Sequence, residues 1–541
     1  MIQTKTYKNG LRLVFEKNEK SVVSANIMFN VGSQNEEKHQ EGFSHFIEHL
    51  IFKGTKEMNA LDIMDKLTFF GADFNAFTSK TMTKFVFKCL AENFEKCFEI
   101  YADMLINAEF EQTELDRERQ VVIEEMKRCD DEPTEILYKR VMNNYFDGLS
   151  YAHDELGEEK SQEGYSHFIE HLIFKGTKDM GALDIMDKLT FYGADFNAYT
   201  SKTMTKFVFK CLPENFEKCF EIYTDMLVNA EFDKTELDRE RQVVIEEMKR
   251  CDDEPTEVMY RRVMDNYFAG LTYAHDELGT EEIIENVSRE ELLKYKNKYY
   301  KAENCVISIV GNLDFDELDK IVEKNFSCHF NYEAKPNKVD QEPYKIKISK
   351  TYDIVERDDN QANVCILVKS VSSIEEEKYI ADLYTSILGN SQNSRLFKII
   401  REKLGLVYTI YAYNEISPKA GELMIVFGTR PKNVKKAMIE IKKAIVDFAE
   451  NGATEEELVR AKNWKKSCLS FGTETNSNVA EINGSIYNLY GKTFDKEERL
   501  KKIEKVTLED VNNFAKRILN EKEFAVVAVG KDLSLEDLKE Y

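Results

Sequence analysis

The sequence of 541 residues predicts an α+β fold, in which helices pack on sheets of short strands. Apolar runs of strand length recur along the whole chain, and between them lie longer segments whose apolar residues are spaced as on one face of a helix. A segment of 122 residues, 36–157, occurs again as 158–279, and a polar segment with two prolines, 333–343, follows the repeats. We therefore expect an N-terminal domain, 1–332, the linker 333–343, and a C-terminal domain, 344–541.

The first predicted elements are two strands of one sheet. A turn signal at Lys8-Asn9-Gly10 precedes alternating apolar residues at Leu11–Phe15, and Ser24–Val31 has the same character. The elements that follow in the first copy are a helix, a hairpin and three further helices, over Ala60–Phe70, Ala72–Ser79 with Lys84–Leu90, Glu92–Asn107, Thr113–Cys129 and Pro133–Phe146.

Strands and helices also alternate after the repeats. The predicted strands are Asn304–Gly311, which is expected to be buried, Val364–Lys369, Glu422–Phe427 and Phe524–Gly530. The predicted helices are Ser288–Tyr300, Asp314–Phe326, Val434–Asn451 and Thr454–Ser467. This mixture is typical of a second α/β half.

The two copies, Glu36–Gly157 and Glu158–Gly279, align without gaps and are identical at about 105 of 122 positions. A pair of units is no solenoid, which needs at least three stacked repeats, so the pattern indicates a tandem duplication of part of one domain. Each copy brings its own hairpin, but the strands at Leu11–Phe15, Ser24–Val31 and Asn304–Gly311 occur once. We therefore expect only one copy to be built into a complete sheet, and the sequence leaves open which.

One seven-residue motif occurs in both copies, as Ser44–Leu50 and as Ser166–Leu172. Its two histidines are four residues apart, so on a helix they lie one above the other, with the intervening glutamate beside them. Imidazole nitrogens suit zinc, whose catalytic sites use three protein ligands and leave one position open. A glutamate beside such a site can take a proton from water. The pattern His-x-x-Glu-His is a known zinc-peptidase signature.

The same residues are also compatible with an ordinary solvated helix face. The chain has eight histidines, and four of them lie in these two motifs, which favours a metal site. A third ligand is available downstream, because Glu118 and Glu125 are seven residues apart and share a helix face, whereas Glu124 points elsewhere. One carboxylate of this pair can bind the metal while the other orients the site.

Composition narrows the class of function. A net charge of −24 argues against nucleic acid, whose phosphates repel an acidic surface. Most of this charge lies in the copies, −12 in 36–157 and −11 in 158–279, which either favours basic or neutral peptides or reflects solvated helices. The ten cysteines form no Cys-x-x-Cys pair and are expected to be reduced. Neither a membrane-spanning run nor a signal-peptide core occurs, so we expect no membrane partner and a cytoplasmic location.

Five motifs together give the chain a family resemblance. They are Gly42–His49, Phe52–Thr55, Phe74–Ser79, Arg117–Met126 and Arg401–Tyr408. With them the chain resembles the pitrilysin/insulinase family of zinc metallopeptidases, of the shorter bacterial type similar to the β subunit of mitochondrial processing peptidase. The resemblance covers the chain apart from one extra copy of the repeat. It implies two related α/β halves, each an antiparallel-rich sheet packed by helices, around a chamber for peptides.

The resemblance also implies roles for the motif residues, with Zn²⁺ as the cofactor. In the first copy the zinc ligands are His45, His49 and Glu125, the general base is Glu48, and the supporting carboxylate is Glu118. In the second copy the zinc ligands are His167, His171 and Glu247, the general base is Glu170, and the supporting carboxylate is Glu240.

Substrate contacts are implied in the same way. The strand with Asn75, Ala76 and Phe77, or the one with Asn197, Ala198 and Tyr199, is expected to pair with an extended peptide. Arg401 and Tyr408, which the residues alone would make a surface cation and a core aromatic, are implied to steady the substrate carbonyl as charge develops.

The function expected from these observations is a zinc endopeptidase that acts on unfolded peptides. Because family members of this length usually work as dimers, a homodimer is also expected. The alternative is a structural or partner subunit without turnover. Relatives of that kind typically lose the zinc motif, and this chain keeps it twice.

Overall fold

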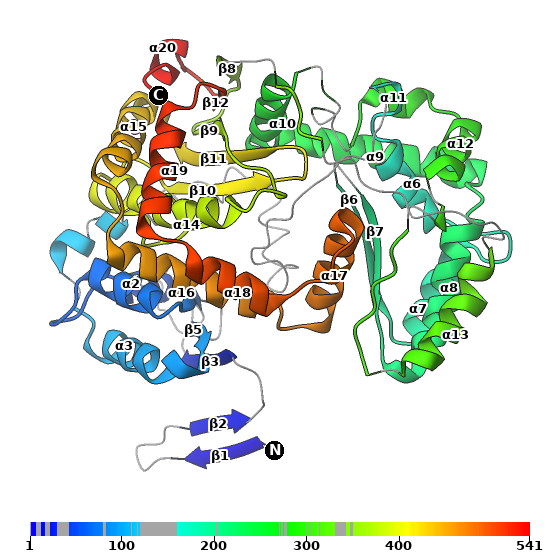
Figure 1. The fold of residues 1–541 in the computed structure, drawn as a ribbon, viewed down its shortest axis with the longest axis horizontal. Helices are drawn as coiled ribbons and strands as arrows, with labels where there is room; N and C mark the ends of the chain where they lie inside the picture. Colours follow the sequence, from blue (N-terminus) through cyan, green and yellow to red (C-terminus); the bar gives the residue numbers. More distant parts are fainter. Residues whose placement is uncertain are drawn as a thin grey trace. The chain divides into compact units, whose positions relative to one another are not determined.

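The structure is a computed structural model (Figure 1). It describes residues 2–6, 12–16, 22–29, 43–78, 83–109, 111–115, 117–119, 160–201, 204–269, 271, 274, 278–299, 301–302, 305–312, 314–329, 342–346 and 350–541. These residues form two compact units, of which one combines 1–146 with 456–474 and the other combines 147–455 with 475–541. Each unit contains sheets with packed helices, and the predicted α+β class is confirmed.

The first unit contains the first copy and the N-terminal strands. Strand β3 (Val22–Phe29) pairs with β5 (Thr83–Leu90), which pairs with β4 (Asp73–Thr78), and both pairings are antiparallel. Strands β1 (Ile2–Thr6) and β2 (Arg12–Glu16) form a separate antiparallel hairpin. The prediction that the strands at 11–15 and 24–31 share one sheet is therefore wrong, because β2 pairs with the strand just before it while β3 pairs with the hairpin of the first copy.

Three helices of the first copy follow the predicted pattern. They are α1 (Phe43–Ile51), α2 (Ala60–Phe69) and α3 (Phe94–Asn107). Helix α2 begins at a reciprocal cap, in which the Asn59 side chain accepts from the backbone N–H of Asp62 and the Asp62 carboxylate accepts from that of Asn59. One face of α3 contributes the fully buried ring of Tyr101, whose hydroxyl donates to the Val86 carbonyl at 2.8 Å.

Helix α16 (Glu455–Phe471) completes the first unit by packing on α2. The Asn463 side-chain amide donates to the Phe69 carbonyl at 2.7 Å, and the Arg460 guanidinium lies 3.8 Å from Asp65. Gly71 has a φ of +67°, and a Cβ added there would meet the Ser467 hydroxyl and the Asn463 carbonyl. The chain leaves the second unit to contribute this one helix and then returns.

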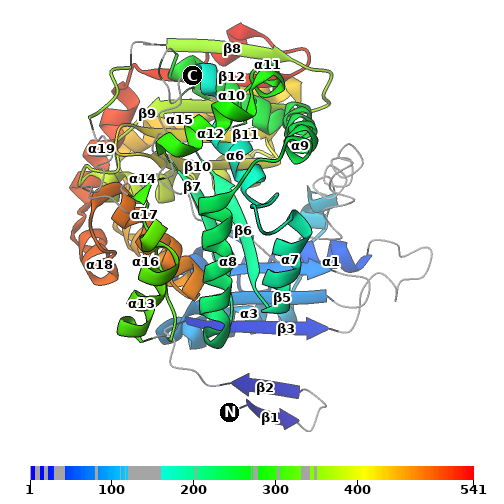
Figure 2. The same cartoon turned by 90° about the vertical axis from the view of Figure 1, so that its right-hand side faces the viewer.

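The second copy forms the same local elements within the second unit. Helices α6 (Tyr165–Ile173) and α7 (Ala182–Phe191) precede the antiparallel hairpin of β6 (Asp195–Thr200) and β7 (Thr205–Lys210). Helix α8 (Phe216–Asn229) packs beside α7 (Figure 2), and α9 (Lys234–Asp253) follows. Within the described part of the chain this hairpin is two-stranded, whereas the first copy gains a third strand from β3.

A five-stranded sheet lies in the C-terminal part of the second unit. Its strands, in spatial order, are β10 (Thr409–Ile416), β11 (Gly421–Thr429), β9 (Ala362–Lys369), β12 (Phe524–Gly530) and β8 (Lys350–Glu356). The β12–β8 pair is parallel and the other pairs are antiparallel. The predicted strands at 364–369, 422–427 and 524–530 are confirmed as β9, β11 and β12.

Helices cover both faces of this sheet. Helix α10 (Pro255–Tyr267) packs Met259, Val263 and Tyr267 against alternate side chains of β9, β11 and β12. Helix α14 (Lys378–Leu388) packs on β10, and α15 (Val434–Asn451) and α19 (Leu508–Asn520) join it (Figure 1). The rings of Tyr384, Phe448 and Phe514 tie these three helices together, with centroids 4.8 and 5.3 Å from Tyr384.

The remaining helices of the second unit are short or connect the larger elements. They are α11 (Glu281–Asn286), α12 (Arg289–Tyr299), α13 (Phe315–Asn325), α17 (Asn476–Tyr490), α18 (Lys496–Lys505) and α20 (Leu535–Leu538). The helices predicted over 288–300 and 314–326 are confirmed as α12 and α13, and those over 434–451 and 454–467 as α15 and α16. In the described part of the chain, no helix combines the length and the apolar character that crossing a bilayer requires.

Some sequence predictions lie outside the described residues, and a second one is wrong. The helix expected over 113–129 is helical where it is described, at 112–115 and 117–119, and the helix expected over 133–146 lies outside these residues. Most of the linker 333–343 also lies outside them, and the division into halves stays a prediction. The buried strand expected at 304–311 is wrong, because 305–310 is in no strand and Val306 and Ile307 are 37% and 38% exposed. Its Ser308 hydroxyl donates instead to the Ala480 carbonyl in α17.

The two copies offer a matched test of the α2–α16 contact. Replacement of Gly71 by Ala should weaken this contact, because the new methyl group meets α16, whereas Gly193→Ala has the same φ of +67° and no neighbour within 4 Å among the described residues. Both changes carry the left-handed backbone cost of about 1–2 kcal/mol. Trp464, the one tryptophan of the sequence, lies on α16 and reports its unfolding. The urea midpoint of Trp464 fluorescence should fall in Gly71→Ala and not in Gly193→Ala; equal shifts would contradict the packing.

Candidate metal centre

Helix α6 is fixed by the burial of one face. Phe168, Ile169 and Leu172 are fully buried in the core of the second copy. The helix begins after Gly164, whose φ is +85° and whose Cα approaches the backbone of Leu278 and Gly279 so closely that a Cβ would clash. With this face buried and this start fixed, the motif side chains of α6 are directed toward α9.

Helix α9 supplies carboxylates to the same place. It begins at Asp233, whose carboxylate accepts from the backbone N–H groups of Thr235 and Glu236 at 2.8 and 3.3 Å. Leu237, Val244 and other apolar residues of one face are buried in the same core as α6. The seven-residue spacing of Glu240 and Glu247 places both carboxylates beside α6.

Three side chains form a cluster that could hold a metal ion. One ligand atom from each of His167, His171 and Glu247 lies within 4.8 Å of the other two. Glu247 Oε2 is 3.8 Å from His167 Nε2 and 3.5 Å from His171 Nε2. Two imidazoles and one carboxylate are a donor set typical of catalytic zinc, which leaves a fourth position for water or substrate.

Glu240 orients this cluster. Its Oε2 is 3.2 Å from His171 Nδ1 and its Oε1 is 2.8 Å from the Lys175 ammonium, and the carboxylate is almost fully buried. A carboxylate bound to Nδ1 leaves Nε2 of the same ring, which faces Glu247, as the metal-binding nitrogen. The lysine compensates the buried negative charge of Glu240.

The neighbouring charges and burial shift the pKa values of the three side chains in the cluster in different directions. Burial, followed by the neighbouring His171, lowers the pKa of His167 to about 4, so this imidazole is neutral at pH 7. Its Nδ1 is buried without a hydrogen-bond partner. Burial also acts to lower the pKa of His171, but hydrogen bonds to Glu247 and Glu240 outweigh it and the pKa is raised. The hydrogen bond from His171 lowers the pKa of Glu247. A cation bound between these three side chains would satisfy the Glu247 carboxylate and the Nε2 atom of each imidazole ring.

Glu170 lies on α6 between the two histidines. The Thr200 hydroxyl at the end of β6 donates to Glu170 Oε2 at 2.5 Å. Burial raises the pKa of Glu170, although the hydrogen bond from Thr200 opposes the shift. A carboxyl whose pKa is moved toward neutrality is suited to accept a proton and release it again.

The first copy shows part of the same arrangement. His49 Nδ1 is 3.2 Å from Glu118 Oε2, and the Lys53 ammonium is 2.7 Å from Glu118 Oε1, as in the second copy. Glu48 lies half-buried on α1, and the backbone of His45 is part of the same helix. Glu125, the third expected ligand of this copy, lies outside the described residues. The structure therefore brings a complete ligand set together in the second copy.

The strands expected to bind substrate are edge strands in the described sheets. Among the described strands, β4 pairs only with β5, and β6 pairs only with β7. The side chain of Asn197 makes hydrogen bonds within its own strand. Its Nδ2 donates to the Tyr199 hydroxyl and its Oδ1 accepts from the backbone N–H of Ala198, both at 2.9 Å. Asn75 accepts from Ala76 in the same way. The free edges are compatible with peptide pairing, and these roles stay predictions.

Arg401 and Tyr408 lie in the C-terminal part of the second unit. Arg401 belongs to a π-helix at 397–403, where its guanidinium lies over the Phe397 ring and 3.5 Å from Glu402. The Tyr408 hydroxyl donates to the Asn363 side chain at 3.2 Å. Phe397, Glu402 and Asn363 all belong to the C-terminal part of the second unit, so the roles of Arg401 and Tyr408 at the metal cluster stay predictions.

Sequence reasoning missed two residues of the site. Thr200 holds Glu170, and Lys175 neutralises Glu240. A signal for the lysine was present, because Lys175 follows His171 by four residues and belongs to the repeated Phe-Lys-Gly-Thr motif. Thr200 carries no such signal, since its contact depends on how the hairpin packs against α6.

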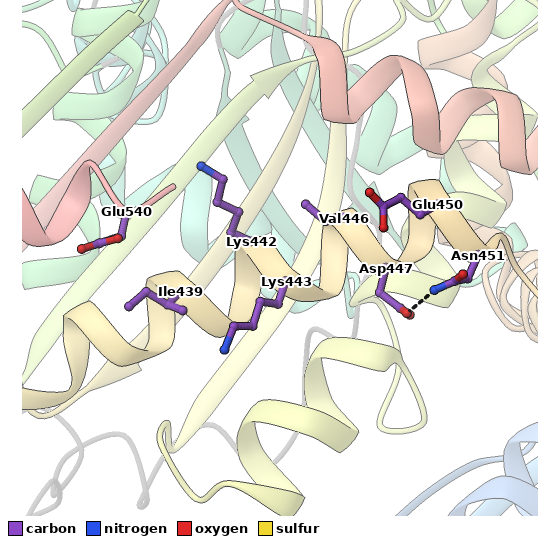
Figure 3. A pocket seen from close by; sticks show the side chains of 8 residues that line it. All are labelled: Ile439, Lys442, Lys443, Val446, Asp447, Glu450, Asn451 and Glu540. Carbon is purple, nitrogen blue, oxygen red and sulfur yellow. Dashed lines mark hydrogen bonds between the residues drawn. The ribbon is translucent and has the colours of Figure 1, made fainter.

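A pocket on α15 is not the site. It is lined by Ile439, Lys442, Lys443, Val446, Asp447, Glu450, Asn451 and Glu540 (Figure 3). Asp447 accepts a hydrogen bond from Asn451 at 2.7 Å. The lining contains no histidine or cysteine and shares no residue with the metal cluster, so the chemistry is placed at α6 and α9.

Fold and site together define a class, an α+β protein with a His-x-x-Glu-His sequence on one helix and the third side chain of the cluster on another. The family model for insulinase, peptidase family M16, matches residues 12–154 and again 155–281, and the model for the peptidase M16 inactive domain matches 286–464. The chain belongs to peptidase family M16.

Curated relatives agree with this assignment. The uncharacterized zinc protease YmxG of Bacillus subtilis is 30% identical over 66% of this chain and 86% of its own. An uncharacterized zinc protease of Rickettsia bellii is 31% identical over 70% and 90%. The crystal structure of a peptidase M16 inactive domain from Pseudomonas fluorescens matches with a TM-score of 0.53 at 16% identity, over 99% of this chain and 98% of that one, which supports the fold alone.

Loss of the orienting carboxylate should weaken metal binding in the second copy. We expect Glu240→Gln to lower zinc affinity about 10–100-fold, because the amide cannot fix His171 as the carboxylate does. Competition with a chromophoric chelator measures the affinity, and the matched change Glu118→Gln in the first copy shows which site is titrated. Unchanged affinity in Glu240→Gln, with intact circular dichroism, would contradict this role.

Proposed function

We propose that the chain is a zinc-dependent metalloendopeptidase whose working site is the cluster in the second copy. The observation that carries the proposal is the convergence of His167, His171 and Glu247 beside Glu170. Membership of peptidase family M16 and relatives named zinc proteases support it. The donor set fits the ion, because imidazole nitrogens and a carboxylate oxygen are ligands that zinc prefers.

When bound, zinc supplies a Lewis acid that polarises a carbonyl and favours ionisation of water. The chain's own residues supply the rest. Glu170 accepts the proton of the attacking water at a carboxylate oxygen and passes it to the leaving amine. Thr200 holds that carboxylate in place, and Glu240 fixes the orientation of His171. The raised pKa of Glu170 suits a group that must both take and give a proton.

The substrates that fit are extended peptides. The edge of β6 that has no partner among the described strands offers backbone groups to a peptide strand, and only an unfolded segment can pair in this way. The acidity of both copies favours basic or neutral peptides over acidic ones. We propose a homodimer and a cytoplasmic setting on the family resemblance.

One observation keeps a second function open. Residues 286–464 match the model named the inactive domain, which favours a partner or structural role for that part of the chain. A chain that acted only as a partner subunit would bind zinc without cleaving peptides. Activity measurements on purified protein separate the two functions.

The general base is tested by Glu170→Gln. This variant should keep its zinc and lose nearly all cleavage of unfolded peptides, because the amide cannot accept the proton. The matched variant Glu48→Gln changes the same motif in the first copy and should retain most activity. Zinc content and cleavage of a fluorogenic peptide are measured on the same preparations. Full activity in Glu170→Gln, or its loss only in Glu48→Gln, would place the working site elsewhere.

The C-terminal half is tested by Arg401→Ala and Tyr408→Phe. If these side chains stabilise charge on the substrate carbonyl, each change should lower kcat by roughly a hundredfold or more. Zinc content and the thermal transition should stay as in the parent chain. Parental turnover in both variants would remove these residues from the mechanism.

A further inference from the structure

The same ten-residue helix occurs in the chain in two surroundings. Residues 60–69 and 182–191 have identical sequences and form α2 and α7. Helix α2 lies under α16, while α7 presents the corresponding face to solvent. The pair is therefore an internal comparison in which the sequence is constant and the cover differs.

Exposure shows the difference directly. Met64 is 6% exposed on α2, and its counterpart Met186 is 50% exposed on α7. Thr68 is buried, whereas Thr190 is exposed. Phe191 and Leu183 of α7 are 82% and 76% exposed. Exposed large apolar side chains that are grouped on one face are typical of a contact surface.

The residues of the first copy that contact α16 all recur in the second copy, on α7, directly after it and on β7. Arg460 lies beside Asp65, Asn463 donates to the Phe69 carbonyl, and Ser467 lies over Gly71. The Lys88 ammonium is 4.8 Å from the ring centroid of Phe471 at the end of α16. The counterparts in the second copy have the same identities, and they are Asp187, Phe191, Gly193 and Lys210.

The backbone of the second face is also preformed. Gly193 has the same φ of +67° as Gly71, and the position that a Cβ would occupy is open among the described residues. Asp187 and Gly193 are exposed, whereas Gly71 is buried under α16. Because the glycine allows a helix to approach closely, the absence of a side chain there suits a docked helix.

We propose that the outer face of α7, formed by Leu183, Met186, Asp187, Phe191 and Gly193, is a docking site for helix α16 of a second molecule of this chain. The occupant follows from the structure, since α16 is the helix that the identical face of α2 already binds. The chain also contributes α16 as a separate segment, because the residues on both sides of it belong to the other unit.

Each chain then has two faces for one α16 helix. When α16 docks on α7 of a second molecule, it leaves α2 of its own molecule. The exchange therefore replaces the α2–α16 contact by an equivalent α7–α16 contact. Association between whole chains should therefore be weak and reversible. An added α16 peptide has no α2 of its own and should bind to α7 without that competition.

The first experiment measures binding of a fluorescein-labelled peptide of residues 455–471, with Cys468→Ser, to the full-length chain by anisotropy. We expect saturation at one peptide per chain. Met186→Glu and Phe191→Ser should each weaken binding at least tenfold, whereas Ile106→Glu, at an apolar position 78% exposed on α3, should leave it unchanged. A peptide with Arg460→Ala and Asn463→Ala should also bind at least tenfold more weakly.

The second experiment tests whether the helix that docks on α7 comes from a second molecule of this chain. Sedimentation velocity of the full-length chain from about 1 to 100 µM should show reversible association, which excess peptide, Met186→Glu or Phe191→Ser abolishes. Circular dichroism of both variants checks that they fold. Absence of peptide binding, or binding that the α7 variants do not change, overturns the docking site. If the chain stays monomeric over this concentration range, or if it associates and the variants leave the association intact, the helix that docks on α7 does not come from a second molecule.

Discussion

The metal cluster depends on one constraint, the burial of the apolar face of α6 against the core of the second copy. Successive residues of a helix are about 100° apart, so the choice of buried face decides where every other side chain points. With Phe168, Ile169 and Leu172 buried, His167 and His171 face α9. A helix turned by one residue would direct the histidines away from Glu247. The geometry of the cluster therefore follows from the hydrophobic effect acting on residues that are not part of it.

Charge compensation then makes the arrangement tolerable. The Glu240 carboxylate is almost fully buried, and an unpaired buried charge is costly. Lys175 pairs with one oxygen of Glu240 and His171 with the other. His171 lies on the last turn of α6, and Lys175 follows it by four residues, just after the helix ends. The same three-residue arrangement recurs in the first copy with Glu118, His49 and Lys53. It is thus a property of the segment and its two helices.

The sequence predicted those parts of the site that are local. Spacings of four and seven residues on single helices place His167 with His171 and Glu240 with Glu247 before any tertiary contact is known. The hairpins and the amphipathic helices were predictable for the same reason. What could not be predicted depends on choices between distant partners. The strand β3 pairs with the first copy, although both copies present a nearly identical edge. Ser308, in a segment that was predicted to be a strand, bonds to Ala480 of α17.

The helices α2 and α7 show where this limit lies. Their sequences are identical, their bounds correspond residue for residue, and both bury their central Ile and Leu residues. Yet Met64 is covered and Met186 is half exposed, because only one of the two helices has α16 beside it. Helix formation and the direction of the inner face are written in the local sequence. Whether the outer face is buried depends on whether another helix packs on it. Because the segment occurs twice and α16 once, the outer face of one of the two helices stays exposed, even though the sequence of both helices is the same.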